Sequence, residues 1–136
     1  DEYLETDAEK IPTGRILPLK DTTLDLRRPV EMRCVHADHT FLLPGDGTLH
    51  PTGRVMDPAS GRMLEVETDY PAVQVYTADG MAETRGKAGT VYGPRRGFCL
   101  ETQCCPDAPN HPNFPSALLR AGETFFHQTV WRFGIT

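Results

Sequence analysis

The chain has 136 residues, which is enough for one domain with its own hydrophobic core. Its formal net charge is -5 and its basic residues stand singly or in pairs, which excludes the clustered Lys and Arg side chains that nucleic-acid binding needs. No run of about 18 apolar residues occurs, so we expect no membrane span and no membrane partner.

Cysteine usage by itself leaves the redox compartment open. The chain contains Cys34, Cys99, Cys104 and Cys105, and the last two are a poor disulfide because neighbouring Cα atoms are only about 3.8 Å apart. The acidic first residues lack the apolar stretch of a secretory signal, so we expect reduced thiols and a cytoplasmic location. A metal site needs a ligand set such as two spaced Cys pairs, which this chain lacks, so we expect no metal.

The first twenty residues do not resemble the beginning of a domain. Residues 11–14 are typical of a turn, and residues 16–19 predict a short strand or sheet edge. We find no earlier strand for them to pair with, and an unpaired strand leaves an open sheet edge. We therefore expect a missing segment upstream of Asp1.

The rest of the chain predicts short strands separated by Gly and Pro, twelve of each, which are spread evenly. A hairpin is expected where residues 57–61 join residues 53–56 to residues 62–68, because Pro58 presets φ and Gly61 accepts a positive φ. Further strands are expected at the following ranges: 40–43, 73–76, 98–103 and 124–133. The fold class is therefore all-β and mostly antiparallel, with Trp131 and its neighbouring aromatic side chains in the core.

The most informative stretch is residues 97–103, Gly-Phe-Cys-Leu-Glu-Thr-Gln, followed by a proline-rich loop at residues 106–116. It places the carboxylate of Glu101 in an apolar strand beside a stiff loop. A carboxylate on a rigid, partly dry strand is what general-base chemistry requires. The same alternation also fits a solvated glutamate on an outer strand face, so the residues alone leave both interpretations open.

Seven segments in chain order carry a family resemblance. They are Asp-Glu-Tyr-Leu (1–4) with Ile-Pro-Thr-Gly (11–14), Thr-Thr-Leu-Asp-Leu-Arg (22–27), Asp-His-Thr-Phe-Leu-Leu (38–43), residues 60–77, residues 98–103, residues 106–116, and Gly-Glu-Thr (122–124) with the closing aromatic strand. Together they resemble the C-terminal part of the aldose 1-epimerase (galactose mutarotase) family.

The resemblance implies a fold and an activity. Such enzymes fold as one large antiparallel β-sandwich, the galactose mutarotase-like supersandwich, of roughly twice this length or more. They interconvert the α and β anomers of free aldohexoses such as galactose and glucose by acid–base ring opening and reclosure, without a cofactor. Residues 1–136 would then be the C-terminal portion of the domain, with the upstream portion on a second polypeptide or a missing segment.

The resemblance also implies three site residues. Glu101 matches the catalytic base, and Asp38 and Gln74 match substrate-binding positions. The bland alternatives are that Asp38 caps a turn before a strand and that Gln74 is an exposed strand residue. The family's acid histidine belongs to an upstream motif. Neither His39, which is out of phase with Asp38, nor His111, which we expect to pack in its loop, matches that histidine.

Two other functions stay open from the sequence. The first is a non-catalytic sugar-binding or regulatory module that keeps the scaffold, Asp38 and Gln74 and works without an acid. The second is a relative that acts on phosphorylated sugars, which would need a basic clamp for the phosphate. Only Arg95 and Arg96, which are expected to be exposed, offer such a clamp.

Overall fold

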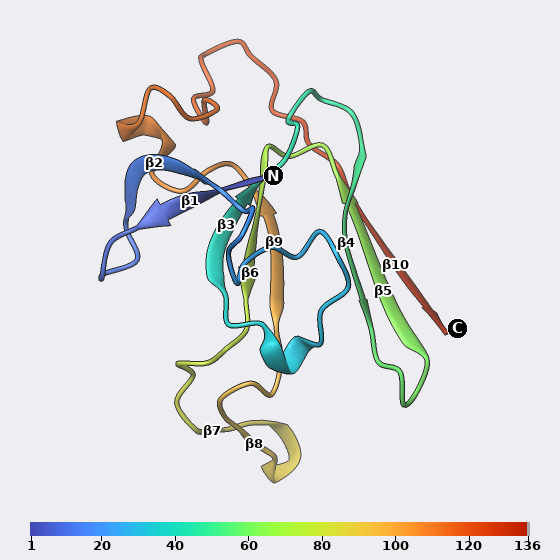
Figure 1. Cartoon of the computed structure of the whole chain (residues 1–136). Helices are drawn as coiled ribbons and strands as arrows, with labels where there is room; N and C mark the ends of the chain where they lie inside the picture. Colours follow the sequence, from blue (N-terminus) through green and yellow to red (C-terminus); the bar gives the residue numbers. More distant parts are fainter. Residues whose placement is uncertain (136) are drawn as a thin grey trace. The chain divides into compact units, whose positions relative to one another are not determined.

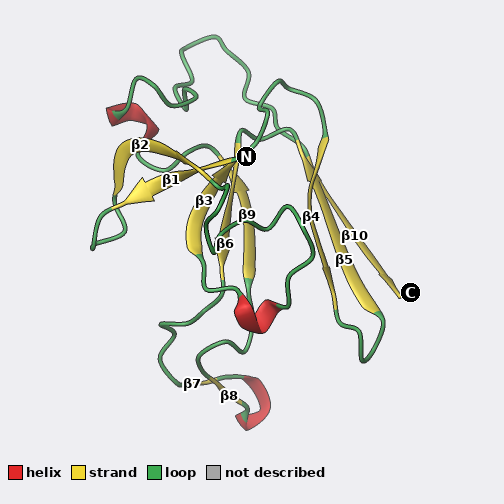
Figure 2. Ribbon diagram, in the orientation of Figure 1, coloured by secondary structure: helices red, strands yellow, loops and turns green. Residues whose placement is uncertain are grey.

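Ten short strands make up most of the regular structure of residues 1–135, the part of the chain that this computed structural model describes (Figures 1 and 2). They are β1 (Glu2–Thr6), β2 (Pro12–Pro18), β3 (Asp38–Leu42), β4 (His50–Met56), β5 (Arg62–Thr68), β6 (Ala72–Tyr76), β7 (Thr84–Arg85), β8 (Val91–Tyr92), β9 (Cys99–Gln103) and β10 (Thr129–Ile135). Three 3-10 turns, η1 (Met32–Cys34), η2 (Lys87–Gly89) and η3 (Ala108–Asn110), complete the list. No helix among the described residues is long and apolar enough to cross a membrane.

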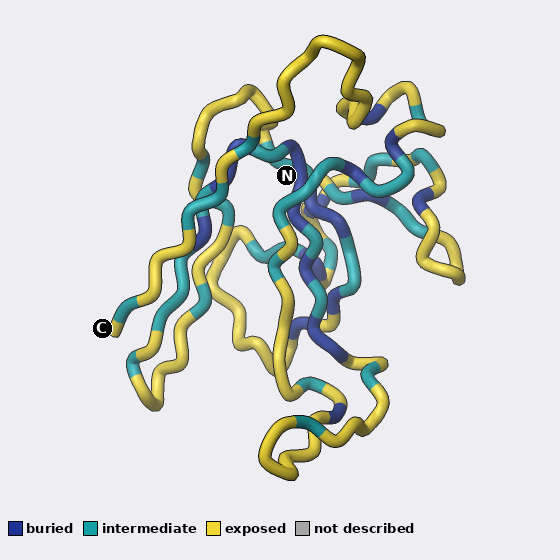
Figure 3. The backbone as a smooth tube through the Cα atoms, turned by 180° about the vertical axis from the view of Figure 1, so that it is seen from behind, coloured by how far each residue is buried: buried dark blue, intermediate teal, exposed yellow. Residues whose placement is uncertain are grey.

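The strands form three sheets. Their orders are β2-β1-β3-β6-β9, β10-β5-β4 and β7-β8. The pairs β1–β2, β1–β3, β4–β5, β5–β10 and β7–β8 are all antiparallel, as the sequence predicts. The short β7–β8 ribbon, which the sequence analysis does not anticipate, is mostly exposed in the burial view of Figure 3.

Contacts divide the chain into two compact units. The first contains Asp1–Phe41 and Gln74–Glu101, and the second contains Leu42–Val73 and Thr102–Thr136. The core residues of the first unit are apolar side chains from strands and the loops beside them: Leu4, Leu19, Leu24, Val35, Ala37, Phe41, Val75 and Ala78. Those of the second unit include Val66, Val73, Cys105, Ala108 and Phe114.

An N-terminal hairpin corrects the expectation that residues 16–19 have no earlier strand to pair with. β1 pairs with β2, Tyr3 lying opposite Leu17 and Leu4 opposite Ile16. Asp7 closes the turn, because its carboxylate accepts hydrogen bonds from the backbone N–H of Glu9 at 2.9 Å and of Ile11 at 3.0 Å. The sequence analysis missed this Asx-type turn, in which a side chain takes the role of a Gly or Pro signal.

The β4–β5 hairpin confirms its predicted turn chemistry. Gly61 has a φ of 69°, the left-handed region that glycine tolerates, and its N–H bonds to the carbonyl oxygen of Asp57 at 2.8 Å. Along β5, Val66 and Thr68 are buried on one face, whereas Glu65 and Glu67 of the other face are only half-buried. The period of two therefore predicts correctly which side chains share a face.

The C-terminal strand is shorter than predicted and its aromatic residues are not core. β10 begins at Thr129, five residues after the predicted start. Trp131 is 42% exposed and Phe133 80% exposed, so the expectation that they are buried is wrong. They lie opposite Val66 and Leu64 of β5, on a sheet face that the described residues leave largely open at this edge strand.

Candidate functional site

Asp38, Thr40 and Gln74 form a continuous line of hydrogen bonds across two neighbouring strands. Thr40 Oγ1 donates to Gln74 Oε1 at 2.5 Å, and Gln74 Nε2 donates to Asp38 Oδ1 at 2.9 Å. All three side chains belong to the first compact unit. The structure thus joins the two residues that the sequence analysis singles out for sugar contact, and adds Thr40, which it did not predict.

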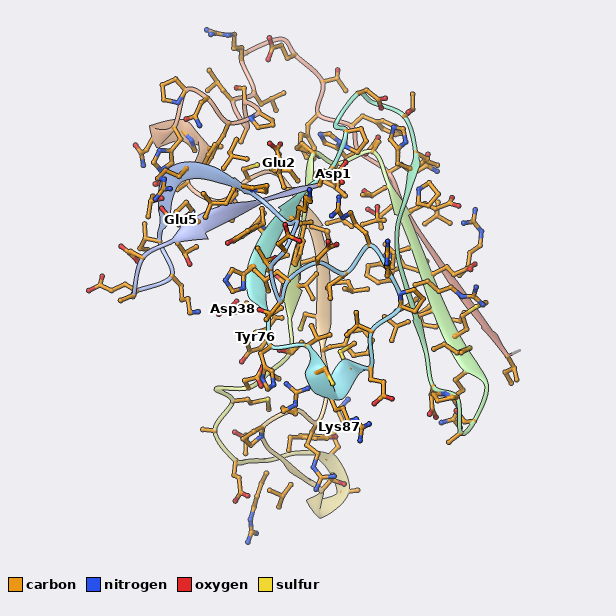
Figure 4. All side chains as sticks on the ribbon, viewed as in Figure 1. Asp1, Glu2, Glu5, Asp38, Tyr76 and Lys87 are labelled. Atoms are coloured by element: carbon orange, nitrogen blue, oxygen red, sulfur yellow. The ribbon has the colours of Figure 1, made fainter. Side chains whose placement is uncertain are left out.

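The backbone explains why these side chains meet. β3 and β6 are neighbours in the sheet, and the N–H of Thr77 bonds to the carbonyl oxygen of Ala37 at 2.8 Å. A second backbone bond, from the N–H of Leu43 to the carbonyl oxygen of Pro71 at 2.8 Å, shows that the two strands run antiparallel. Counting between the two bonds places Asp38 opposite Tyr76 and Thr40 opposite Gln74. Side chains directly opposite each other in such a ladder point to the same face of the sheet. Asp38 and Tyr76 accordingly lie close together in Figure 4.

Asp38 is the first residue of a strand and does not lie in a turn before it. β3 begins at Asp38, two residues earlier than predicted, because pairing with β6 extends the ladder. Its carboxylate is half-buried, and Oδ1 accepts the bond from Gln74. Among the described residues Oδ2 has no hydrogen-bond partner, so this oxygen is a free acceptor. Gln74 uses one N–H for Asp38 and keeps the second.

Glu101 lies on β9, the strand next to β6. The predicted alternation holds for Cys99 and Glu101, which are exposed, and for Leu100 and Thr102, which are half-buried, but Gln103 at the end of β9 is half-buried too. The expectation of a partly dry carboxylate is wrong for the described residues. The Glu101 side chain is exposed, and no hydrogen bond or ion pair joins its carboxylate to another of the described residues.

A charged network borders Asp38 at the start of β3. Arg95 Nη1 donates to Asp79 Oδ1 at 2.6 Å and to the carbonyl oxygen of Val35 at 2.9 Å, and Nη2 donates to the carbonyl oxygen of Met32 at 2.7 Å. His36 Nδ1 lies 2.7 Å from the same Asp79 oxygen. Hydrogen bonds from Thr77 and then from Arg95 hold the pKa of Asp79 well below its usual range.

The network was not predicted from the sequence. Its members are far apart along the chain, and Arg95 gave no signal except as part of an expected exposed pair. With its guanidinium occupied by a carboxylate and two carbonyl oxygens, Arg95 has little capacity left to bind a phosphate. This weakens the reading of the site as one for phosphorylated sugars.

His39 and His111, the two histidines considered for the acid role, make other contacts. His39 is half-buried and packs edge-on to Tyr3, with ring centroids 5.8 Å apart, and burial lowers its pKa. His111 Nε2 lies 3.1 Å from Oδ2 of Asp107 without hydrogen-bond alignment, and its ring centroid is 4.8 Å from that of Phe114. The expectation that His111 packs within its loop is confirmed.

A second polar cluster stands in the other compact unit. Asp69 is buried, and its Oδ1 accepts from the N–H of Gln128 at 2.9 Å and lies 3.0 Å from His127 Nδ1. The ring of His127 stacks on Tyr70 at 4.1 Å. Burial alone would raise the pKa of Asp69, but the bonds from Gln128 and His127 outweigh it and lower that pKa. The bonds of Asp69 to His127 and Gln128 fix the chain just before β10, so we assign this cluster a structural role.

The described residues include no group of three or more His, Cys, Asp or Glu side chains that could hold a metal ion. The first unit presents polar groups that can form hydrogen bonds in defined directions. A carboxylate with one free oxygen, a carboxamide with one free N–H, and a further carboxylate on the next strand can bind hydroxyl groups and accept a proton.

The sequence matches a family model described as aldose 1-epimerase over residues 1–132. The chain belongs to the aldose 1-epimerase family. It is 46% identical to galactose mutarotase from Homo sapiens over 143 aligned positions, which cover 99% of this chain and 42% of that protein. It is 31% identical to aldose 1-epimerase from Haemophilus influenzae, across 98% of this chain and 42% of the relative.

A solved structure supports the same assignment. The crystal structure of a GalM/aldose epimerase homologue from C. elegans matches with a TM-score of 0.90 and 26% identity, covering 99% of this chain and 43% of that one. The predicted fold class, an antiparallel β structure of the aldose 1-epimerase kind, is confirmed. The chain spans about 42% of the length of the curated aldose 1-epimerase relatives that it matches.

Proposed function

We propose that residues 1–136 form the C-terminal portion of an aldose 1-epimerase that acts on a free aldohexose such as galactose or glucose. The upstream portion of the single sandwich domain would lie outside this sequence, on a preceding segment or a second polypeptide. Two findings support this assignment. The chain belongs to the family, and it aligns with only 42% of the length of the galactose mutarotase relative. Its active site would include Glu101, Asp38 and Gln74.

Each residue has a role in the proposed reaction. Glu101 accepts the proton of the C1 hydroxyl while the bond from C1 to the ring oxygen breaks. A histidine of the upstream portion donates a proton to that ring oxygen. The open aldehyde rotates about its C1–C2 bond and closes on the other face, with both proton transfers reversed. Asp38 accepts hydrogen bonds from sugar hydroxyls and Gln74 donates one, so that the reacting carbon is held in place.

The observation that carries the proposal is the Asp38–Gln74 pair. Its 2.9 Å bond leaves one acceptor and one donor on one sheet face, a combination that suits a hydroxyl group because hydroxyls both donate and accept. Glu101 follows on the adjoining strand. The Glu101 side chain is exposed in residues 1–135. In the proposed enzyme, the upstream portion would therefore exclude water from the reacting carboxylate.

Replacing the base tests the proposal. In the protein with its upstream portion, Glu101→Gln should slow the mutarotation of α-galactose by about 10²–10⁴-fold, because the general base is lost. Polarimetry measures this rate directly. Glu9→Gln, at an exposed position of the β1–β2 turn, serves as the matched control and should leave the rate unchanged. An active protein whose rate survives Glu101→Gln would show that the base assignment is wrong.

A non-catalytic sugar-binding module is the second candidate. The observation in its favour is that the Asp38–Gln74 pair is assembled in this chain whereas Glu101 is exposed. Such a module would bind galactose through the pair without affecting its mutarotation, even with the upstream portion present. Isothermal titration with galactose, run beside polarimetry, separates the two candidates.

The proposed location is the cytoplasm. Cys34, Cys99, Cys104 and Cys105 are all free, which suits a reducing compartment. Burial, and then the neighbouring Cys104, raise the pKa of the Cys105 thiol to about 11, so this thiol stays protonated and unreactive at neutral pH.

A further inference from the structure

Thr40 is a buried hydroxyl whose one side-chain bond goes to a proposed substrate-binding residue. It is 4% exposed, and its Oγ1 donates to Gln74 Oε1 at 2.5 Å. A carboxamide oxygen can only accept, so the hydroxyl hydrogen of Thr40 points at Gln74. Burial removes water as an alternative partner for Oε1 on that side.

The Gln74 side chain is therefore held at both ends of its amide. Oε1 is held by Thr40 and Nε2 by the carboxylate of Asp38. The reverse orientation would place Oε1 against the negative Asp38 oxygen, with two acceptors facing each other. The charge of Asp38 and the hydroxyl group of Thr40 thus favour the same orientation of the Gln74 amide. A glutamine side chain loses rotamer freedom when it is ordered, and here this ordering precedes any ligand.

This arrangement sets what the pair offers to a ligand. Asp38 keeps Oδ2 as an acceptor and Gln74 keeps its second N–H as a donor, each in a defined direction. Binding sites whose polar groups are already ordered lose less entropy when the ligand arrives. The residue that orders Gln74 should therefore affect sugar affinity without touching the sugar.

We propose that Thr40 is a positioning residue of the sugar site, which orients Gln74 through its hydroxyl and so fixes the donor and acceptor that Gln74 and Asp38 present. The assignment rests on the proposed function, since it names the support of that same site. Thr40 touches neither the sugar nor Glu101.

The test uses Thr40→Val, which keeps the shape and removes the hydroxyl, and Thr40→Ser, which keeps the hydroxyl. In the protein with its upstream portion, we expect Thr40→Val to raise the KM for galactose about three- to tenfold, the range set by one neutral hydrogen bond, with kcat little changed. Thr40→Ser should restore most of the affinity. Thr84→Val is the control, because the Thr84 hydroxyl bonds only to the backbone oxygen of Ala82 on an exposed strand.

A second measurement needs no sugar. The side-chain NH2 group of Gln74 gives a pair of signals in a nitrogen–proton correlation spectrum. Those signals should keep their positions in Thr40→Ser and in Thr84→Val, and should shift or broaden in Thr40→Val as the amide gains freedom. A purely structural role of Thr40 would instead lower the active fraction, and thus kcat, while KM stayed constant.

The outcomes separate the two proposals. Unchanged KM and unchanged Gln74 signals in a Thr40→Val protein that binds galactose normally would overturn the role of Thr40 alone. A wild-type protein that neither binds galactose nor speeds its mutarotation would overturn the proposed function. In that case shifted Gln74 signals in Thr40→Val would still support the orienting bond.

Discussion

At the scale of single residues, Asp38 is held by a bond to its side chain and by bonds to the backbone before it. Gln74 binds one of its oxygens, and the segment before it is tied down where Arg95 bonds to the carbonyl oxygens of Met32 and Val35. A guanidinium offers five donors in a rigid fork, so one side chain can fix several acceptors at once. The position of Asp38 is thus set by bonds from residues far away in sequence.

Asp38→Asn should weaken sugar binding. The substitution keeps size and one acceptor oxygen but removes the charge, and hydrogen bonds to charged groups contribute about 1.5–3 kcal/mol. We expect the dissociation constant for galactose to rise roughly ten- to hundredfold by isothermal titration. The control is Asp46→Asn, on an exposed loop of the other unit. Equal affinity in Asp38→Asn and wild type would remove Asp38 from the site.

At the scale of elements, side chains decide where the C-terminal strand begins. The N–H of Gln128 bonds to the Asp69 carboxylate, and the carbonyl oxygen of Gln128 accepts from Thr68 Oγ1 at 3.0 Å. The N–H of Asp69 still bonds to the carbonyl oxygen of Gln128 at 3.2 Å, but the N–H of Gln128 is taken by the Asp69 side chain and not by the backbone. The ring of His127 stacks on Tyr70 just before β10. The pattern of alternating aromatics continues through this junction and so predicts a longer strand than the one formed.

Asp69→Asn should destabilise the fold in a pH-dependent way. The pKa of Asp69 is lowered in the folded state, so its stabilisation is complete above the ordinary value of 3.8 and is lost as pH falls through the lower folded-state pKa. At pH 7 we expect a loss of about 1–3 kcal/mol in the free energy of unfolding, from one weakened buried acceptor.

Urea unfolding at a series of pH values between 7 and below 3.8 measures this effect. The difference between wild type and Asp69→Asn should shrink as the pH falls. Asp57→Asn, in the exposed β4–β5 turn, provides a comparison at a carboxylate outside the junction. A difference that stayed constant over that range would mean that the charge of Asp69 does not stabilise the start of β10.

At the scale of the whole molecule, an apolar face lies open on β10. Trp131, Phe133 and Ile135 alternate along the strand and are 42%, 80% and 81% exposed. Large exposed apolar patches mark surfaces that another part of a protein covers. Since the chain spans about 42% of its curated relatives, we propose that the upstream portion covers this face.

Trp131 reports on this proposal, because it is the chain's single tryptophan. With 5-fluorotryptophan at this position, residues 1–136 alone should show a fluorine resonance that shifts with added deuterium oxide and an emission that acrylamide quenches readily. Joining the upstream portion proposed above should protect Trp131 from both. Equal solvent sensitivity in the two states would show that another surface receives the upstream portion.

The sequence by itself determined the alternation of side chains along β5 and most of β9, the β4–β5 turn and the order of the family motifs. These are local properties, because strand period and turn chemistry depend on near neighbours. It also selected Asp38 and Gln74, although through resemblance and not through geometry.

Only the tertiary structure decided which faces are covered and which side chains meet. Gln74 reaches Asp38 and Thr40 across separations of 36 and 34 residues, and no local pattern encodes that bond. The exposure of Glu101 and Trp131 could not be predicted from the sequence either. A period of two tells which residues share a face, but not whether another segment packs on that face. Burial is a property of the assembled sheets, and it is there that the sequence-based expectations went wrong.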